Sequence, residues 1–539
     1  MPPYEPETEK GIAMSSAPTA PLGLLPDIAA EKHGSTVFTS DTPWVAYGRP
    51  VNDIADFSRA VHDYADRFWA AGVRPGDVVA VVQRNHVEIQ ALACGLARIG
   101  ALPAPLSVRM EAAEILECLA MLDRPVAVMD STVLPKLRNL KNAMRGLTKK
   151  VLYLTPADGA AATVPGFDWL VPTGERQPHQ AQARGADEWV LVTHTSGTTA
   201  LPKLAAHSTR SLYGMVESQV ALMRRFGVSA LAAKHLTFVH ARMSATTLGL
   251  LEVAMPLLSI ADPDPEHVRT LLLEHRPDSL ETHPNIFLQW ESLATHPSRP
   301  LAPVQRFIST FDAMHPRTIR TLLAGSDHPN AQYLQGYGQT ETGGVAARQV
   351  LRAEIDTYNP RNVGHPIENA AVRVVNAAGE PVPAGEIGFI QSKSPGRFCG
   401  YVGEPAAPTK EEWWPMGDLG RQQPDGSLEL LDRIVDHLDG YDSLLEKEDQ
   451  LLELLPELVE VVLLRPVGDA DLVAVAVPRE GEELDQERFQ AAAAKLGLGE
   501  VLAFGWKWKS MPLTGSYKVR RSVLWTYVNA WHTSTAKVT

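Results

Sequence analysis

The chain of 539 residues is too long for one hydrophobic core and predicts at least two domains. Its composition, with 45% hydrophobic and 21% charged residues, is ordinary for a soluble globular protein. The net charge of −13 argues against nucleic acid as a general partner. No apolar run reaches the roughly 18 residues that a membrane-spanning helix needs, which argues against a membrane protein.

The start of the chain, residues 1–23, is rich in Pro, Ala, Glu and Ser. It lacks the basic start and the apolar stretch of a secretory signal peptide. We therefore expect a disordered leader over these residues and a cytoplasmic protein. The three cysteines are scattered without metal-binding spacing, as expected for reduced thiols.

Expected helices and strands alternate along the first part of the chain. Apolar residues recur at helical spacing over 52–71, and 86–99 is a second expected helix. Continuous apolar runs at 78–82, 126–129 and 151–154 are typical of buried parallel strands. This alternation predicts a doubly wound α/β sheet.

An expected strand at 189–192 leads into a loop, 195–203, that is rich in hydroxyl groups. Hydroxyls and backbone N–H groups on such a turn are the short donors that bind a phosphate. The Walker phosphate-binding motif is absent, because no Ser or Thr follows Lys203. The loop indicates either a phosphate site or an ordinary polar surface turn.

Two later segments carry further candidate binding residues. The apolar run 236–240 predicts a strand that ends on His240, which taken alone is more often a structural histidine than a functional one. Further on, Tyr337 can stack on a purine, Gly338 permits a close approach, and the carboxylate of Glu341 can hold Mg²⁺ beside phosphates.

From about residue 359 the pattern changes to short alternating strands separated by Gly and Pro turns. It predicts a small β-rich subdomain over 359–433. Asp418 in this subdomain follows a glycine, and its carboxylate can accept hydrogen bonds from both hydroxyls of a ribose. The alternative is an exposed turn aspartate. The remaining residues, 434–539, predict a small α+β domain, in which Lys518 taken alone is a solvated charge.

Four motifs stand in order along the chain. They are Ser-Gly-Thr-Thr-x-x-Pro-Lys at 196–203, Tyr-Gly-x-Thr-Glu at 337–341, Gly-Asp-Leu-Gly at 417–420 and Pro-Leu-Thr-Gly-Ser-Tyr-Lys at 512–518. Together they resemble the signatures of the adenylate-forming superfamily, which comprises acyl-CoA synthetases, peptide-synthetase adenylation domains and luciferases. The resemblance covers about residues 35–530.

The resemblance implies a large N-terminal domain over 24–433, made of doubly wound α/β subdomains and the β-rich subdomain. A mobile lid over 434–539 follows it, with the hinge at Val435. In the implied reaction a carboxylate attacks the α-phosphate of Mg-ATP, giving an acyl-adenylate and pyrophosphate. The lid then swings, and a thiol, usually that of CoA, displaces AMP. The implied cofactors are ATP or acyl-AMP, Mg²⁺ and CoA, the partner is a small carboxylic acid, and a homodimer is the default oligomer.

The resemblance also assigns roles to single residues. The implied catalytic residues are His240, Thr340, Glu341 and Lys518. The implied nucleotide-binding residues are Thr195, Ser196, Gly197, Thr198, Thr199, Lys203, Tyr337, Gly338, Asp418 and Arg433. The implied acid pocket is formed by His240, Ser244, Ala245, Ala313 and Gly336. The implied metal ligands are Thr198 and Glu341, and the implied CoA tunnel is lined by Gly440 and Tyr441.

Six places depart from the superfamily pattern, and they cluster around the nucleotide. They are Ala200 and Leu204 in the phosphate loop, Phe311 and Asp312 in place of a glycine-containing pair, Met416, Val435, Tyr441 and Asp442 in the tunnel, and Tyr517. Side chains at such places remove backbone freedom or fill space beside the phosphates. The departures predict that adenylation is slowed, lost or altered in geometry.

Three functions remain open. The primary hypothesis is an acyl-CoA ligase for a bulky apolar acid, with a weak adenylation step, so that preformed acyl-AMP is thioesterified. Small residues around the acid pocket leave volume for such a substrate. The second is an adenylate-forming enzyme without CoA, such as a carrier-protein loader or a diazotase-like ligase. The third is a non-catalytic relative, and retention of the implied nucleotide-binding and catalytic residues argues against it.

Overall fold

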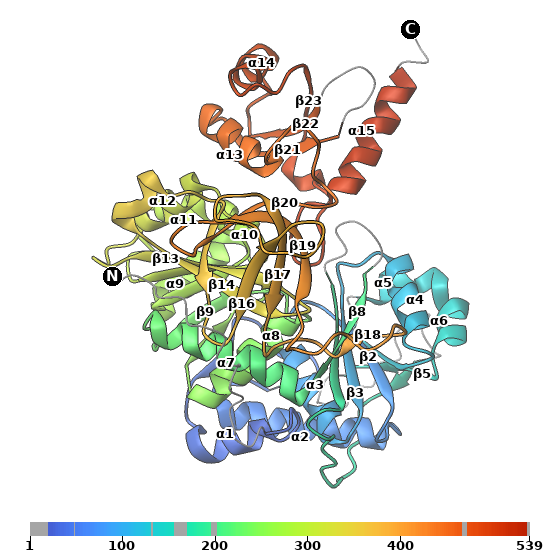
Figure 1. The fold of residues 1–539 in the computed structure, drawn as a ribbon. Coiled ribbons are helices and arrows are strands. Elements are labelled where there is room, and N and C mark those ends of the chain that lie inside the picture. Colours follow the sequence, from blue (N-terminus) through green and yellow to red (C-terminus); the bar gives the residue numbers. More distant parts are fainter. Residues whose placement is uncertain are drawn as a thin grey trace.

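The computed structural model of the protein describes residues 20–47, 49–130, 133–155, 170–195, 202–465 and 472–535. The large domain contains three sheets, and a smaller domain at the C-terminal end contains a fourth (Figure 1). The smaller domain, drawn in orange and red, stands on the large domain at the top of the view. This arrangement confirms the predicted α/β fold with a large N-terminal and a smaller C-terminal domain.

The first sheet is parallel and has five strands in the order β3-β2-β4-β5-β6. The strands are β2 (Val78–Gln83), β3 (Leu102–Ser107), β4 (Val126–Met129), β5 (Lys150–Tyr153) and β6 (Val171–Pro172). The predicted strands at 78–82 and 126–129 coincide with β2 and β4, whose apolar residues are almost all buried. The two prolines of β3 are tolerated because this strand lies at the edge of the sheet.

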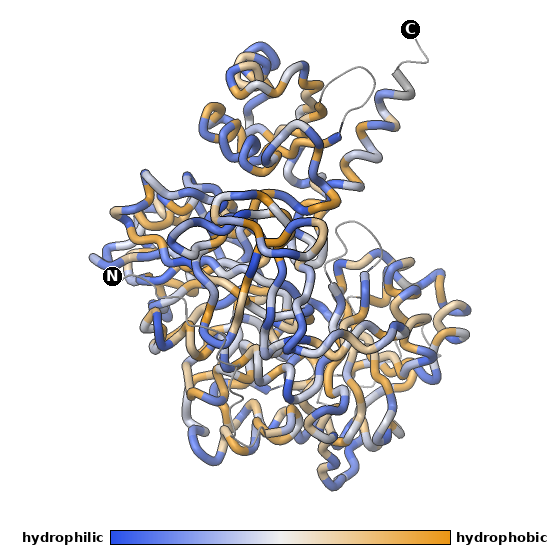
Figure 2. The backbone as a smooth tube through the Cα atoms, viewed as in Figure 1, coloured by the Kyte–Doolittle hydropathy of each residue, from blue (hydrophilic) through white to orange (hydrophobic). Residues whose placement is uncertain are grey.

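Helices alternate with these strands. They are α1 (Leu25–His33), α2 (Ile54–Ala70), α3 (Glu88–Arg98), α4 (Ala112–Met121), α5 (Leu134–Leu137), the 3-10 turn η1 (Arg138–Leu140) and α6 (Lys141–Leu147). Asp53 caps α2 by accepting a hydrogen bond from the backbone N–H of Asp56 at 2.7 Å. Such helices alternate hydrophobic and hydrophilic residues, as Figure 2 shows, because one side packs on a sheet and the other meets water.

The second sheet has twelve strands in the order β1-β10-β9-β11-β12-β13-β14-β15-β20-β19-β17-β16. The pairs from β1 to β13 are parallel, and those from β13 to β16 are antiparallel. The parallel half comprises β1 (Phe38–Ser40), β9 (Ala232–His235), β10 (Leu257–Ser259), β11 (Ser279–Thr282), β12 (Arg306–Ser309) and β13 (Gln332–Gln339). The antiparallel half comprises β14 (Gly343–Leu351), β15 (Asn362–Pro366), β16 (Ala371–Val375), β17 (Gly388–Lys393), β19 (Trp414–Gln422) and β20 (Leu428–Arg433).

The third sheet and the remaining helices complete the large domain. The sheet consists of β7 (Trp189–His194), β8 (Leu204–Ser208) and β18 (Gly400–Tyr401), and β7 and β8 form an antiparallel hairpin. The helices are α7 (Thr209–Arg225), α8 (Ala241–Val253), α9 (Pro265–His275), α10 (Pro284–Gln289), α11 (Glu291–Ala294), α12 (Pro316–Gly325) and the 3-10 turn η2 (Arg352–Thr357). None of the described helices combines the length and the apolar character that crossing a membrane requires.

The C-terminal domain is built on a sheet with the order β21-β22-β23. Its elements are α13 (Leu444–Leu454), β21 (Leu458–Leu464), β22 (Leu472–Pro478), α14 (Gln486–Lys495), β23 (Val501–Gly505), the 3-10 turn η3 (Trp508–Ser510) and α15 (Arg521–Thr535). It touches the large domain directly: Arg361 pairs with Asp449 at 2.9 Å, and Arg317 donates to the carbonyl of Leu458 at 2.9 Å. We call this domain the lid; the boundary predicted at residue 433 stays a prediction.

The predicted strand at 236–240 is wrong. The strand there is β9, which ends at His235, and His240 is instead the residue before α8. The backbone of the apolar run bonds to side chains and not to a neighbouring strand: Asn85 accepts from the N–H of Phe238 and donates to the carbonyl of Leu236, each at 2.9 Å. An apolar run whose backbone is satisfied in this way can be buried without being a strand.

The predicted leader over 1–23 falls mainly on residues 1–19, which lie outside the described residues. Of the four that are described, Leu22 is buried in the main hydrophobic core. Gly23 also lies against the backbone of Arg98 in α3, so closely that a Cβ atom there would clash. Packing against the large domain therefore begins before residue 24.

Candidate active site

The predicted phosphate loop connects β7 to β8. Ser196, Gly197, Thr198, Thr199 and Ala200 lie outside the described residues, so the roles proposed for them stay predictions. The two ends of the loop are joined, because the N–H of Thr195 donates to the carbonyl of Lys203 at 2.9 Å and the N–H of Lys203 donates to Oγ1 of Thr195 at 3.1 Å. The hairpin thus holds a short loop at the end of β7.

Lys203 and Glu341 meet at the same tyrosine. The ammonium of Lys203 lies 4.3 Å from the ring centroid of Tyr401 and 3.5 Å from a carboxylate oxygen of Glu404. The hydroxyl of Tyr401 donates to the carboxylate of Glu341 at 2.6 Å. The base of the phosphate loop and the carboxylate predicted to hold Mg²⁺ are therefore neighbours.

The residues of the Tyr-Gly-x-Thr-Glu motif lie at the end of β13 and in the turn after it. Gly338 lies so close to β14 that a Cβ atom would fall 2.0 Å from the carbonyl oxygen of Gly343, so only glycine fits. Thr340 occupies the turn, and Glu341 is buried beside it. Oxygen atoms such as those of Glu341 are the ligands that Mg²⁺ prefers. Among the described residues no three His, Cys, Asp or Glu side chains cluster as a metal site.

Asp418 lies at the centre of the nucleotide site that the motifs predict. Its Oδ2 accepts a hydrogen bond from the hydroxyl of Tyr337 at 2.6 Å, and its Oδ1 lies 3.4 Å from Nε of Arg433. Burial raises the pKa of Asp418, although the charge of Arg433 and the hydroxyl of Tyr337 act to lower it. The structure brings these three predicted residues together across β13, β19 and β20.

Lys518 reaches this cluster from the lid. It follows a tight turn in which the N–H of Lys518 donates to Oγ1 of Thr514 at 3.1 Å. Burial lowers the pKa of Lys518, while the nearby carboxylates of Asp312, Asp418 and Glu341 act to raise it. A primary amine that lines the cavity below the lid together with Asp312 is placed to meet the negative charge of a nucleotide phosphate.

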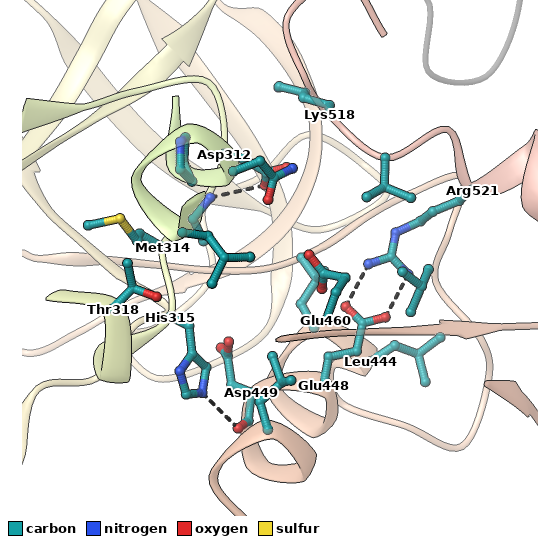
Figure 3. A pocket seen from close by; sticks show the side chains of 18 of the residues that line it. Asp312, Met314, His315, Thr318, Leu444, Glu448, Asp449, Glu460, Lys518 and Arg521 are labelled. Carbon is teal, nitrogen blue, oxygen red and sulfur yellow. Dashed lines mark hydrogen bonds and ion pairs between the residues drawn. The ribbon is translucent and has the colours of Figure 1, made fainter. Parts of the chain in front are cut away.

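A cavity of about 170 Å³ lies between the large domain and the lid. In Figure 3, Lys518 and Asp312 lie at one side of it, and the ion pair between Arg521 and Glu448 lies at the other. The volume is below the roughly 300–1,000 Å³ of typical ligand pockets.

The surroundings of the predicted acid pocket are aromatic and polar. The ring of His240 lies 5.7 Å from that of His194 and 5.2 Å from that of Phe311, measured between centroids. Phe311 in turn lies 4.6 Å from His283 and has a left-handed backbone, with φ of +82°. Its ring occupies space beside His240, which differs from the deep apolar pocket that the sequence predicts.

The small residues predicted to line that pocket have separate positions. Ser244 and Ala245 are buried in the first turns of α8, Gly336 lies in β13 beside Thr310, and Ala313 lines the cavity below the lid. The predicted hinge residue Val435 is exposed just after β20. Gly440 is exposed, and Tyr441 packs against the core of the lid. The tunnel predicted at Gly440 and Tyr441 stays a prediction.

Sequence analysis missed a second cluster, which holds the lid on the large domain. The Tyr517 ring lies 5.1 Å from that of His283 and 5.9 Å from that of His235, and the guanidinium of Arg109 lies 4.3 Å from its centroid. Its backbone carbonyl accepts a hydrogen bond from Nδ2 of Asn285 at 2.7 Å. One signal was present: a histidine ends β9 and another follows the neighbouring strand β11, and the ends of neighbouring parallel strands meet at one edge.

Replacing Asp418 by alanine is expected to weaken binding of AMP by about 1–3 kcal/mol, the range for hydrogen bonds to charged groups. Titration calorimetry measures this directly. Asp425→Ala is the matched control, because Asp425 lies in the β19–β20 turn, where its side chain bonds to Ser427 and its backbone carbonyl to His365. Equal AMP affinity in wild type and Asp418→Ala would contradict the assignment.

Comparison with known proteins identifies the family to which the chain belongs. The chain is 35% identical over 528 residues to a 3-amino-2-hydroxy-4-methoxybenzoate diazotase of Streptomyces cremeus, covering 93% of this chain and 94% of that protein. It is 28% identical to a feruloyl-CoA synthase of an Amycolatopsis species, covering 95% of each chain. The fold matches an anthranilate CoA ligase in complex with anthranoyl-AMP, with a TM-score of 0.78, 15% identity and coverage of 96% of this chain and 100% of that one. A model of the AMP-binding enzyme family matches residues 39–402, and the chain therefore belongs to this family of the adenylate-forming superfamily.

Proposed function

We propose that the protein is an ATP-dependent diazotase that acts on an amino-substituted aromatic acid and does not use CoA. The observation that carries this proposal is the anchoring of the lid by Tyr517. A relative named as a diazotase, 35% identical over nearly the whole chain, supports the same reaction.

The anchor resists the lid rotation that a thiol-using enzyme needs. Tyr517 has a left-handed backbone, with φ of +60°, which costs a non-glycine residue roughly 1–2 kcal/mol. Contacts with the large domain compensate that cost only while the lid is closed. A second bond acts in the same direction, because Oγ1 of Thr237 donates to the carbonyl of Gly515 at 2.9 Å. These contacts favour a reaction completed in one lid position.

Diazotisation suits an adenylate-forming site because nitrite resembles a carboxylate in shape and charge. A nitrite oxygen attacks the α-phosphorus of ATP, pyrophosphate leaves, and a mixed anhydride of nitrous acid and AMP forms. The aromatic amine then attacks the nitrogen of that anhydride, and AMP leaves with the bridging oxygen. The resulting N-nitroso amine loses its remaining oxygen as water, which takes up both amine protons, and the aryldiazonium ion is left.

Different described residues would serve different parts of this reaction. Asp418 and Tyr337 would bind the ribose and the base, and Lys518 would stabilise charge that develops on the α-phosphate. A Mg²⁺ ion held by Glu341 and the phosphates would neutralise the charge of the leaving pyrophosphate. Phe311, which lies beside two histidines, offers an aromatic surface to the ring of the substrate.

An acyl-CoA ligase is the competing candidate. Sequence similarity to a feruloyl-CoA synthase favours it, although at 28% identity. The bulky side chains at Tyr441 and Asp442, where the superfamily has glycines in its thiol tunnel, speak against it. In this second candidate the carboxylate of the aromatic acid, and not nitrite, would be adenylated.

Pyrophosphate release distinguishes the two reactions. The protein is incubated with ATP, Mg²⁺ and 3-aminobenzoate, with and without nitrite and with and without CoA. A diazotase releases pyrophosphate only with nitrite and gives a diazonium product, which an added naphthol traps as an azo dye. Nitrite-independent release with a CoA thioester as product would reject the proposal in favour of the acyl-CoA ligase.

A further inference from the structure

Three buried histidines, of which His240 and His283 pack on Phe311 and His194 packs on His240, carry ring nitrogens that have no hydrogen-bond partner among the described residues. The nitrogens are Nε2 of His194, Nε2 of His240 and Nδ1 of His283. The three side chains belong to residues that are 2%, 5% and 1% exposed, so water does not satisfy them at the surface. A buried unpaired polar atom costs about 1–3 kcal/mol, which a correctly placed ligand can recover.

The hydrogen bonds of the other ring nitrogens fix two of the three tautomers. Nδ1 of His194 lies 3.1 Å from the carbonyl oxygen of Thr195, which can only accept, so Nδ1 carries the hydrogen and Nε2 carries a lone pair. Thr237 uses its one hydroxyl hydrogen toward Gly515, so its oxygen accepts from Nε2 of His283 at 3.1 Å. Nδ1 of His283 therefore also carries a lone pair.

Both histidines stay neutral near neutral pH. Burial lowers the pKa of His194. Burial also brings the pKa of His283 well below its ordinary value, and the charges of Lys518 and Arg109 lower it further. Burial also lowers the pKa of the intervening His240 to about 3. The two lone pairs remain acceptors, and they can bind N–H or O–H donors but not the oxygens of a carboxylate or nitrite.

Both acceptors lie beneath the loop that carries Lys518. A Cβ atom on Gly515 would fall 3.7 Å from Cε1 of His194, and the ring of His283 lies 5.1 Å from that of Tyr517. A substrate that enters when this loop lifts meets the histidines on one side and Lys518 on the other. The N–H group of the substrate is thus held close to Lys518, which acts on the α-phosphate.

We infer that His194 and His283 form an amine-recognition subsite, which selects aromatic acids carrying a primary amine over those without one. The inference rests on the proposed function for the identity of the acid, and it deepens that proposal by naming the residues that recognise the amine. A site built to accept hydrogen bonds discriminates strongly against an analogue without the donor, because its own polar groups are then left unpaired.

The first test uses the unaltered protein without nitrite, so it does not depend on diazotisation. Calorimetry in the presence of AMP compares 3-aminobenzoate with benzoate. We expect 3-aminobenzoate to bind at least about tenfold more tightly, as one good hydrogen bond implies. Equal affinities would overturn the inference, even if nitrite-dependent turnover is found. A clear amine preference without such turnover would keep the inference and reject the diazotase proposal.

Two variants test the residues. His194→Phe and His283→Phe keep a ring but remove the lone pair, and each is expected to reduce the preference for 3-aminobenzoate to below about threefold while benzoate still binds. His179→Phe is the matched control, because His179 is also a buried histidine with an unpartnered Nε2, but it bonds to Asp66 at 2.8 Å and packs beside Trp69 in α2. The control should retain the preference. An unchanged preference for 3-aminobenzoate over benzoate in both test variants would overturn the inference. If one variant fails to fold, the other variant and the wild-type comparison still test the inference.

Discussion

Replacing Lys518 by alanine is expected to reduce pyrophosphate release about 100- to 1,000-fold, the usual effect of removing one group that stabilises transition-state charge. Lys518 is the lid side chain that lines the cavity below the lid together with Asp312, and the charges of Asp418 and Glu341 also act on it. The amine must reach the α-phosphate accurately, since a displacement of about 1 Å can itself cost on the order of a hundredfold.

The matched control is Lys509→Ala, which removes an exposed lysine from the same domain and should leave the rate unchanged. Conversion of supplied adenylate to product should also survive in Lys518→Ala, because the α-phosphate bond to pyrophosphate is already broken. If the rate of pyrophosphate release by Lys518→Ala stays within threefold of the wild-type rate, Lys518 does not act on the phosphate.

The pH dependence gives an independent measure of the same lysine. Burial lowers the pKa of Lys518 below its ordinary 10.5, so the ammonium loses its charge at a lower pH than a surface lysine does. Pyrophosphate release should therefore fall as the pH rises through this lowered pKa. Lys518→Arg stays charged at every accessible pH, and the alkaline fall should disappear in it even if its rate is lower.

The parallel strands were predictable because their signals are local, and the candidate nucleotide-binding residues, whose role stays a prediction, rest on local signals as well. Continuous Val and Ala runs identify β2 and β4, and the motif around Asp418 places a carboxylate after a glycine within one short segment. The same reasoning failed at 236–240, where the apolar run is a buried loop satisfied by Asn85. Nothing within that run distinguishes such a loop from a strand, because the partner is about 150 residues away.

The aromatic cluster under the lid could not be predicted from local patterns. His194, His283 and Phe311 come from three separate segments, and Tyr517 packs on His283 from the lid. The sequence marked Phe311 and Tyr517 only as departures from a glycine-containing pattern. Phe311 and Tyr517 both adopt the left-handed backbone conformation that favours glycine. They therefore keep the conformation of a glycine and add an aromatic ring at that position.

Replacing Glu281 by glutamine is expected to lower the free energy of unfolding by about 3–5 kcal/mol, because it leaves a buried lysine without its counter-charge. Glu281 in β11 pairs with Lys234 in β9 and with Arg242 in α8. The carboxylate and Lys234 are 2% and 3% exposed, so water cannot replace the lost partner. Calorimetric melting should show a fall of about 4–6 °C for the large domain.

The same carboxylate gives a defined pH dependence. Burial alone would raise the pKa of Glu281, but Arg242 and Lys234 outweigh it and lower the pKa from its ordinary 4.5 to about 2. Because the folded pKa is the lower one, the stabilisation is complete above pH 4.5 and is lost as the pH falls towards 2. The difference in melting temperature between wild type and Glu281→Gln should therefore shrink across that interval.

The double variant Glu281→Leu with Lys234→Met separates loss of charge balance from loss of packing. It removes both buried charges and keeps apolar volume, and replacing a buried pair in this way is often neutral or stabilising. We expect its melting temperature to return close to the wild-type value. Arg242 lies in the first turn of α8, which follows His240, so in Glu281→Gln the position of His240 should loosen as well. If 3-aminobenzoate binds more weakly to Glu281→Gln than to the double variant, the ion pairs of Glu281 also hold the substrate site in place. Equal binding to the two variants would show that these ion pairs contribute to stability alone.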